Sequence, residues 1–176
     1  MIIGTASPQT ETAASLPSID AVTDQNEFRD LYLKHWQTVF GLAFRVTGNA
    51  SDAEDVMQSV FVRLLANRTM LDGARSPEGY LRRSAVNASI DILRQRRVRG
   101  ETELGEHRGG DASVIDKERV RRALARLEPE HAEIFVLCYL EGYTYEELAE
   151  MFQLERGTIA SRLFRIRAEL RDLLSR

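Results

Sequence analysis

Arginine side chains gather in two stretches of this 176-residue chain, and both are suited to contact with nucleic acid. The first stretch covers residues 82–99, in which Asp91 is the only acidic residue. Tyr80 and Asn87 lie beside it, and an aromatic ring and an amide next to a basic groove offer stacking and edge hydrogen bonds to single-stranded bases. Because arginine near a helix C-terminus is favoured by the helix dipole anyway, the run alone is weak evidence. Its candidate residues are Arg82, Arg83, Arg94, Arg96 and Arg97.

The second stretch has the pattern of a helix-turn-helix motif. A capping box that starts at Thr144 opens a short helix to about residue 151, residues 152–154 form a turn, and a longer helix follows to about residue 174. In such a motif the N-terminal part of the second helix meets base edges in the major groove. Arginines there can bind phosphates or guanine, and Ser161 is small enough to allow close approach. An ordinary helical hairpin with a solvated arginine face fits this feature alone about equally well. The arginines concerned are Arg156, Arg162 and Arg165.

Side chains for enzymatic chemistry do not converge anywhere in the sequence. The adjacent Glu146 and Glu147 would point about 100° apart on a helix, and the three histidines have no metal-binding spacing. There is no phosphate-binding loop or nucleophile elbow. The single cysteine, Cys138, fits a reducing compartment, and no apolar run approaches the roughly 20 residues that span a bilayer. We therefore expect a cytoplasmic protein with no membrane insertion, no catalytic residues, no cofactor and no metal.

The net charge of -3 argues at first against a nucleic-acid binder. However, this value averages blocks of opposite sign. Residues 1–24 and 100–118 are acidic, whereas residues 82–99 are strongly basic. Residues 128–150 carry seven glutamates and no lysine or arginine, and a basic stretch follows at residues 155–171. The acidic total therefore does not exclude two DNA-facing surfaces.

The elements that would position these residues are all helical. We predict an all-α fold of two small modules joined by a flexible linker, with the helix-turn-helix in the C-terminal module. The expected divisions are a disordered tail (1–24), an N-terminal module (25–99), a linker (100–116) and a C-terminal module (117–176). Serines are expected to cap two helices of the N-terminal module, at Ser51 and at Ser76 before Pro77. The apolar stripe expected to be buried in the first helix is Leu33, Trp36, Phe40 and Phe44.

Two blocks of sequence then match a known family. The first reads DAEDVMQSVF at residues 52–61 and continues with YLRRSAVN at residues 80–87. The second reads YTYEELA at residues 143–149 and GTIASRLFRIR at residues 157–167. Over about residues 25–176 the chain resembles the extracytoplasmic-function (ECF) group of sigma factors of bacterial RNA polymerase. It differs from the usual pattern at Ser59, Tyr80, Gln153 and Ala160.

The resemblance implies roles for particular residues. Asp55, Gln58 and Phe61 would dock on core RNA polymerase. The loop before Ser76, with Asn87 behind it, would capture a flipped base of the -10 promoter element. The implied -10 DNA-binding residues are Tyr80, Arg82, Arg83, Asn87, Arg94, Arg96 and Arg97. The implied -35 DNA-binding residues are Arg156, Thr158, Ser161, Arg162, Phe164 and Arg165.

These observations predict a non-enzymatic subunit that directs promoter recognition and transcription initiation. Its partners would be core RNA polymerase, promoter DNA and an anti-sigma factor that covers the same surfaces. One alternative is a free-standing dimeric helix-turn-helix regulator, which leaves the first block unexplained. Another is a small hydrolase, which requires a catalytic cluster that the sequence does not show.

Overall fold

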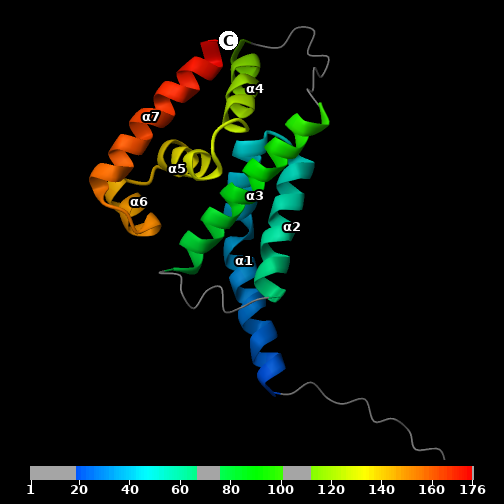
Figure 1. Ribbon diagram of the computed structural model, residues 1–176. Helices are drawn as coiled ribbons and strands as arrows, with labels where there is room; N and C mark the ends of the chain where they lie inside the picture. Colours follow the sequence, from blue (N-terminus) through cyan, green and yellow to red (C-terminus); the bar gives the residue numbers. More distant parts are fainter. Residues whose placement is uncertain (1–18, 67–75, 101–111, 176) are drawn as a thin grey trace, which may run out of the picture.

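The computed structural model describes residues 19–66, 76–100 and 112–175, and these ranges hold seven helices and no strand (Figure 1). The predicted all-α class is therefore confirmed. Among these helices, none is both long and apolar enough to cross a membrane.

The N-terminal half is a bundle of three helices, α1 (Ile19–Thr47), α2 (Ala50–Ala66) and α3 (Pro77–Arg99), each packed on the other two (Figure 1). Helix α1 starts within the range expected to be a disordered tail, so that expectation is wrong for residues 19–24. The rest of the predicted tail, residues 1–18, lies outside the described residues.

Local chemistry explains where these helices begin and end. Gly48 has φ 72°, and its N–H donates to the Phe44 carbonyl over 2.8 Å, which ends α1. The Asn49 side chain accepts from the Asp52 N–H over 3.2 Å, so Asn49, not Ser51, caps α2 and the prediction of a serine cap there is wrong. Ser76 accepts from the Gly79 N–H over 3.0 Å at the start of α3, as predicted.

The buried face of α1 is not the predicted stripe of large apolar residues. Leu33 and Phe44 are 61% and 45% exposed, while the smaller Val39, Ala43 and Val46 are almost completely buried. Small side chains allow α2 and α3 to approach the α1 backbone closely, so they occupy the bundle interior. The remaining stripe residues, Trp36 and Phe40, pack only partly against the core.

The C-terminal half consists of α4 (Ala112–Leu124), α5 (Pro129–Tyr139), α6 (Tyr145–Phe152) and α7 (Arg156–Ser175). Helix α4 includes residues 112–116, which the sequence analysis assigned to the linker, so the linker prediction is wrong there. Residues 101–111 are outside the described part. Gln153, in the turn between α6 and α7, has φ 54°, a conformation that usually favours glycine.

The two halves pack against each other through α3. Helix α5 lies between α7 and α3 and contacts both, and α4 also contacts α3 (Figure 1). Buried residues of both halves form one continuous hydrophobic core. The C-terminal half therefore covers one side of the helix that carries the first arginine stretch.

Candidate nucleic-acid interface

The helix-turn-helix is held by a small apolar core and a capped first helix. Leu148, Ile159, Leu163 and Ile166 are fully buried between α6 and α7 and their neighbours. The Thr144 hydroxyl accepts from the backbone N–H of Glu147 over 3.2 Å, and the Glu147 carboxylate accepts from the Thr144 N–H over 2.8 Å. The predicted capping box is confirmed, and it fixes the start of α6. These hydrogen bonds also lower the pKa of Glu147.

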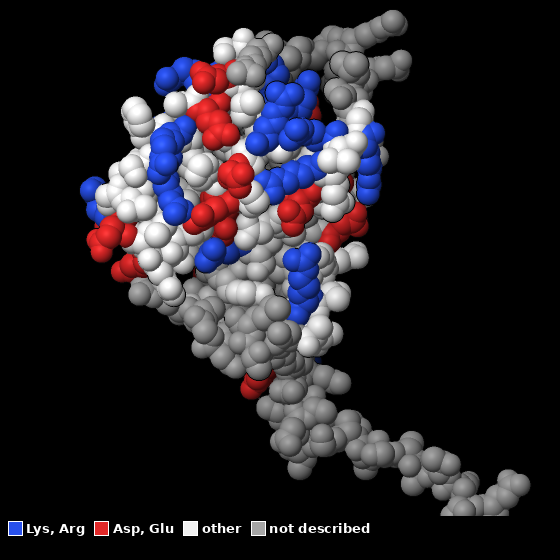
Figure 2. Space-filling model, in the orientation of Figure 1, with Lys and Arg blue, Asp and Glu red and all other residues white. Residues whose placement is uncertain are grey.

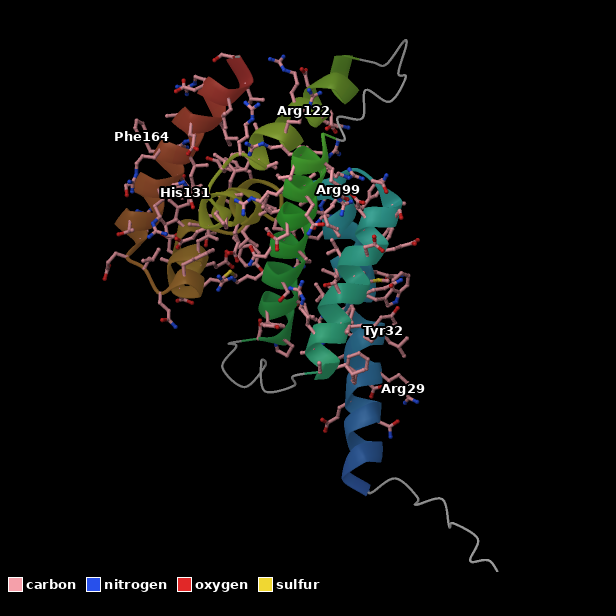
Figure 3. All side chains as sticks on the ribbon, turned by 45° about the vertical axis from the view of Figure 1, so that its right-hand side comes forward. Arg29, Tyr32, Arg99, Arg122, His131 and Phe164 are labelled. Carbon is pink, nitrogen blue, oxygen red and sulfur yellow. The ribbon has the colours of Figure 1, made fainter. Side chains whose placement is uncertain are left out.

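The outer face of α7 carries the residues expected to read DNA. Ser161 and Arg165 are exposed, and Phe164, 68% exposed, points away from α3 (Figure 3). Thr158 is half-buried, and its carbonyl accepts from the Ser161 hydroxyl over 2.9 Å. A surface with one apolar ring and a guanidinium that has no ion pair among the described residues, both on the second helix of this motif, is suited to the major groove.

Two of the α7 arginines expected to read DNA pair with carboxylates of the same half. Arg156 pairs with Glu146 of α6, and this hydrogen bond lowers the pKa of Glu146. Arg162 pairs with Glu130 of α5. Both carboxylates are more than half exposed, so DNA phosphates can compete for these guanidinium groups.

The arginines of α3 lie in a different environment from the open basic groove expected from sequence. Arg82 pairs with Glu78 of its own helix and with Glu141, which follows α5. Although burial opposes the charged form, the hydrogen bond to Glu78 and the charge of Glu141 raise the pKa of Arg82. Arg83 lies 2.6 Å from the Glu133 carboxylate of α5.

Other arginines of α3 donate to backbone or side-chain oxygens. Arg94 donates to the Leu127 carbonyl over 2.6 Å, and Arg97 donates to the Ala125 carbonyl over 3.3 Å. Arg96 instead pairs with Asp52 of α2 over 2.5 Å. Tyr80 and Asn87 are half-buried on the same helix. Figure 2 shows Lys and Arg side chains interleaved with Asp and Glu, not a continuous basic surface.

The candidate polymerase-docking residues lie on α2 and differ in exposure. Asp55 and Gln58 are exposed one helical turn apart. Phe61 is only 4% exposed and makes edge contacts with Phe28 and Tyr32 of α1, with ring centroids 6.3 and 4.8 Å away. The structure therefore places Phe61 in the core, where it supports the helix that presents the other two. A groove of 410 Å³ beside them is lined by Asp52, Asp55, Ser59, Arg63, Asp91 and Arg99.

Sequence reasoning about single residues missed Glu133 and Glu141, the carboxylates that meet the α3 arginines. Their side chains are 6% and 1% exposed. The available signal was the glutamate-rich block at residues 128–150, whose charge is opposite to that of residues 82–99. Within the described residues, no group of three His, Cys, Asp or Glu side chains is arranged to hold a metal ion.

Two helical halves, the second with a helix-turn-helix, define the architecture of a sigma-70-type transcription factor, and the comparisons with known proteins agree. The sigma-70 region 2 family matches residues 31–99, and the sigma-70 region 4 family matches residues 117–170. The RNA polymerase sigma factor CarQ of Myxococcus xanthus is 30% identical, over 85% of this chain and 90% of its own. The ECF sigma factor SigE of Mycolicibacterium smegmatis is 32% identical, but this chain spans only 66% of its length. The chain belongs to the ECF group of RNA polymerase sigma factors.

The fold agrees with solved sigma-factor structures. CnrH, solved in complex with the cytosolic domain of CnrY, superposes with a TM-score of 0.54 at 26% identity, covering 88% of this chain and 92% of CnrH. The match includes both halves, because neither half alone accounts for so much of the chain.

Proposed function

We propose that this chain is a non-enzymatic initiation factor that docks on core RNA polymerase in the cytoplasm and recognises promoter DNA with both halves. One observation carries the proposal: matches to region 2 and region 4 occur in that order on one chain, and each falls on one helical half. This pairing favours a sigma factor over a free-standing helix-turn-helix regulator, which has no use for the N-terminal half.

The docking surface in this proposal is the exposed side of α2. Asp55 and Gln58 present a carboxylate and an amide on one face, next to the groove between α2 and α3. Such groups suit hydrogen bonds and ion pairs with a basic partner helix. We assign Phe61 a supporting role, since its ring packs on α1.

The -10 element is assigned to α3 and the segment before it. Tyr80 offers a ring for stacking and Asn87 an amide for base edges, as single-stranded DNA requires. Phosphate contacts are assigned to Arg82, Arg83, Arg94, Arg96 and Arg97. Because those contacts release counterions, binding is expected to depend strongly on salt.

The -35 element is assigned to α7, which is the second helix of the helix-turn-helix. Its proposed contacts are Arg156, Thr158, Ser161, Arg162, Phe164 and Arg165. We also propose that the segment between α3 and α4 is a linker that lets both halves engage one promoter. Binding by one half then raises the effective concentration of the other.

An anti-sigma factor is the proposed regulator. The support comes from CnrH, which was solved in complex with the cytosolic domain of CnrY and which this chain resembles along most of its length. A partner that covers α2 or α7 would prevent polymerase docking or -35 recognition.

The proposal is tested with purified core polymerase and run-off transcription from fragmented genomic DNA of the source bacterium. We expect the chain to co-purify with core polymerase and to produce discrete transcripts, and Asp55→Ala with Gln58→Ala to lose both. Asp172→Asn, at an exposed position near the end of α7, is the control and should behave as wild type. Tight DNA binding by the chain alone without any binding to core polymerase would refute the proposal.

A further inference from the structure

A stripe of large apolar side chains runs along the outer side of α1. It consists of Leu33, Trp36, Phe40 and Phe44, which follow one another at three or four positions and so share one face of the helix. Leu33 is 61% exposed and Phe44 is 45% exposed, while Trp36 and Phe40 are half-buried. The rings of Phe40 and Phe44 stack on each other, with centroids 6.3 Å apart and planes 9° apart. Apolar side chains that are grouped in this way on a surface indicate an interaction site, whereas scattered ones do not.

Another side of α1 makes the contacts with α3 and the C-terminal half. His35 lines a groove together with Pro77 at the start of α3, and Arg45 pairs with Glu141 of the C-terminal half. At 100° per residue, neither position falls on the face that carries the stripe. Figure 3 shows Arg29, one helical turn before the stripe, pointing away from the C-terminal half. The stripe is therefore open to a partner while both halves are packed together.

A glycine beside the stripe has no role in the fold. Gly41 lies in the interior of α1 and is not among the glycines with positive φ. A Cβ added there would meet only the flexible end of the Arg45 side chain, at 3.7 Å. Glycine inside a helix is destabilising relative to alanine, and it is useful where another backbone approaches closely. Gly41 therefore indicates a second helix that packs tightly against this part of α1.

We propose that the second helix is α1 of another copy of this chain, packed antiparallel on the stripe. The stripe is complementary to itself, because Leu33 and Phe44 lie equally far from its midpoint, as do Gln37 and Phe40. A two-fold axis at this midpoint sets Leu33 of one copy against Phe44 of the other. It also sets Phe40 against Gln37, next to Gly41. Two-fold pairing is the commonest form of oligomer, and it requires a self-complementary patch of this kind.

Charge at the ends of the stripe favours the same arrangement. In the antiparallel pair, Arg29 of one copy lies beside the C-terminal end of the other α1, near Gly48. The last carbonyls of a helix carry partial negative charge, which a guanidinium stabilises. Arg29 is available for this contact, because its ion pair with Asp30 spans 3.6 Å between two largely exposed side chains. The two-fold symmetry makes the contact twice.

The area of the face fits a reversible pair of copies. Between Arg29 and Gly48, α1 is about 28 Å long and about 10–12 Å wide with its side chains, which gives a face of about 300 Å². Leu65 of α2 extends this face, because it is 50% exposed and lies one turn after Phe61, which contacts α1. With about half as much area again from α2, two copies would bury roughly 900 Å², which lies in the range of weak, reversible interfaces. We therefore expect pairing that depends on protein concentration.

The test measures the mass of the full chain by sedimentation equilibrium, from low micromolar to several hundred micromolar protein. We expect the average mass to rise from that of one copy towards that of two. Leu33→Glu places a charge inside the apolar contact and should weaken pairing on the order of tenfold or more. The control, Val98→Glu, makes the same change in charge at an apolar residue of α3 that is 87% exposed, and should pair as wild type. A wild-type chain that stays monomeric, or a Leu33→Glu variant that pairs as well as the control, would overturn the proposal and leave the stripe to a different protein.

A second variant, Gly41→Ala, separates an effect on pairing from an effect on the fold. Alanine is the better helix former and has room for its Cβ, so the urea midpoint of the monomer should rise. Pairing should nevertheless weaken severalfold, because the added Cβ lies where the second helix approaches, and a purely structural role of Gly41 would not produce this combination. Pairing as strong as that of the wild type would overturn the antiparallel contact at Gly41. Neither measurement uses polymerase or DNA, so its outcome is independent of the proposed function.

Discussion

Gly48 lies at the junction of the two halves, and replacing it with alanine should weaken their packing. Its φ of 72° is a conformation in which a Cβ is unfavourable. A Cβ there would also collide with the guanidinium of Arg121, which crosses Gly48 to donate to the Val46 carbonyl over 3.1 Å. Arg121 belongs to α4 and Val46 to α1, so this hydrogen bond joins the halves.

The backbone penalty of a positive φ and the collision with Arg121 can be separated by comparison with Gly100. Gly100 has φ 68°, and no atom lies within 4 Å of a Cβ added there. Gly100→Ala should cost only the backbone penalty, about 1–2 kcal/mol of unfolding free energy. Gly48→Ala adds the displacement of Arg121 and the loss of its hydrogen bond, which as a charged bond contributes about 1.5–3 kcal/mol. We therefore expect about 2.5–5 kcal/mol for Gly48→Ala.

Urea unfolding followed by circular dichroism measures these differences. A double-mutant cycle isolates the collision: in an Arg121→Ala background, Gly48→Ala should cost no more than Gly100→Ala does in the wild type. Equal costs for the two glycines in the wild type, or a Gly48 penalty that persists without Arg121, would show that Arg121 does not pass over Gly48 in solution.

Two further predictions concern the DNA-reading helix and a buried histidine. Arg165, exposed and without an ion pair among the described residues, should contribute directly to duplex binding. Arg165→Ala should lower the slope of log K against log salt for a mixed-sequence duplex by about 0.9, and Arg171→Ala, on another face of α7, should leave it unchanged. Burial, followed by the charge of Lys34, lowers the pKa of His35 in the folded chain. As the pH falls through about 6.5, the unfolded chain therefore binds a proton at this imidazole before the folded chain does. The unfolding free energy should thus decrease from pH 7.5 to pH 5.5. In paired urea titrations, His35→Gln should make this decrease smaller. A decrease of the same size in the variant would contradict the attribution of this pH dependence to His35.

The starts of α3 and α6 and the helix-turn-helix were predictable because short-range chemistry determines them. The Thr144 capping box and the Ser76 cap both follow from residues within four positions of one another. The buried face of α1 was not predictable in this way. Helical periodicity predicted that the large residues of α1 would be buried. In the structure, the close packing of three helices instead buries Val39 and its small neighbours.

The environment of the α3 arginines depended on residues far away in the sequence. Arg83 and Glu133 are fifty positions apart, and Arg82 and Glu141 are fifty-nine apart. Charge blocks of opposite sign were visible in the sequence, but their spacing alone did not show whether they meet each other, a partner or solvent. Only the packing of α5 on α3 turns the two blocks into one interface.

The position of α2 suggests an order of events for the proposed function. Asp55 and Gln58 remain exposed although the C-terminal half is packed on α3, so the surface that we assign to polymerase docking is accessible in this arrangement of the halves. By contrast, three arginines assigned to -10 phosphates, Arg82, Arg83 and Arg94, contact carboxylates or carbonyls of the C-terminal half. We therefore expect docking on polymerase to come first and separation of the halves second. In that order, free protein with a net charge of -3 avoids non-specific DNA until polymerase holds it.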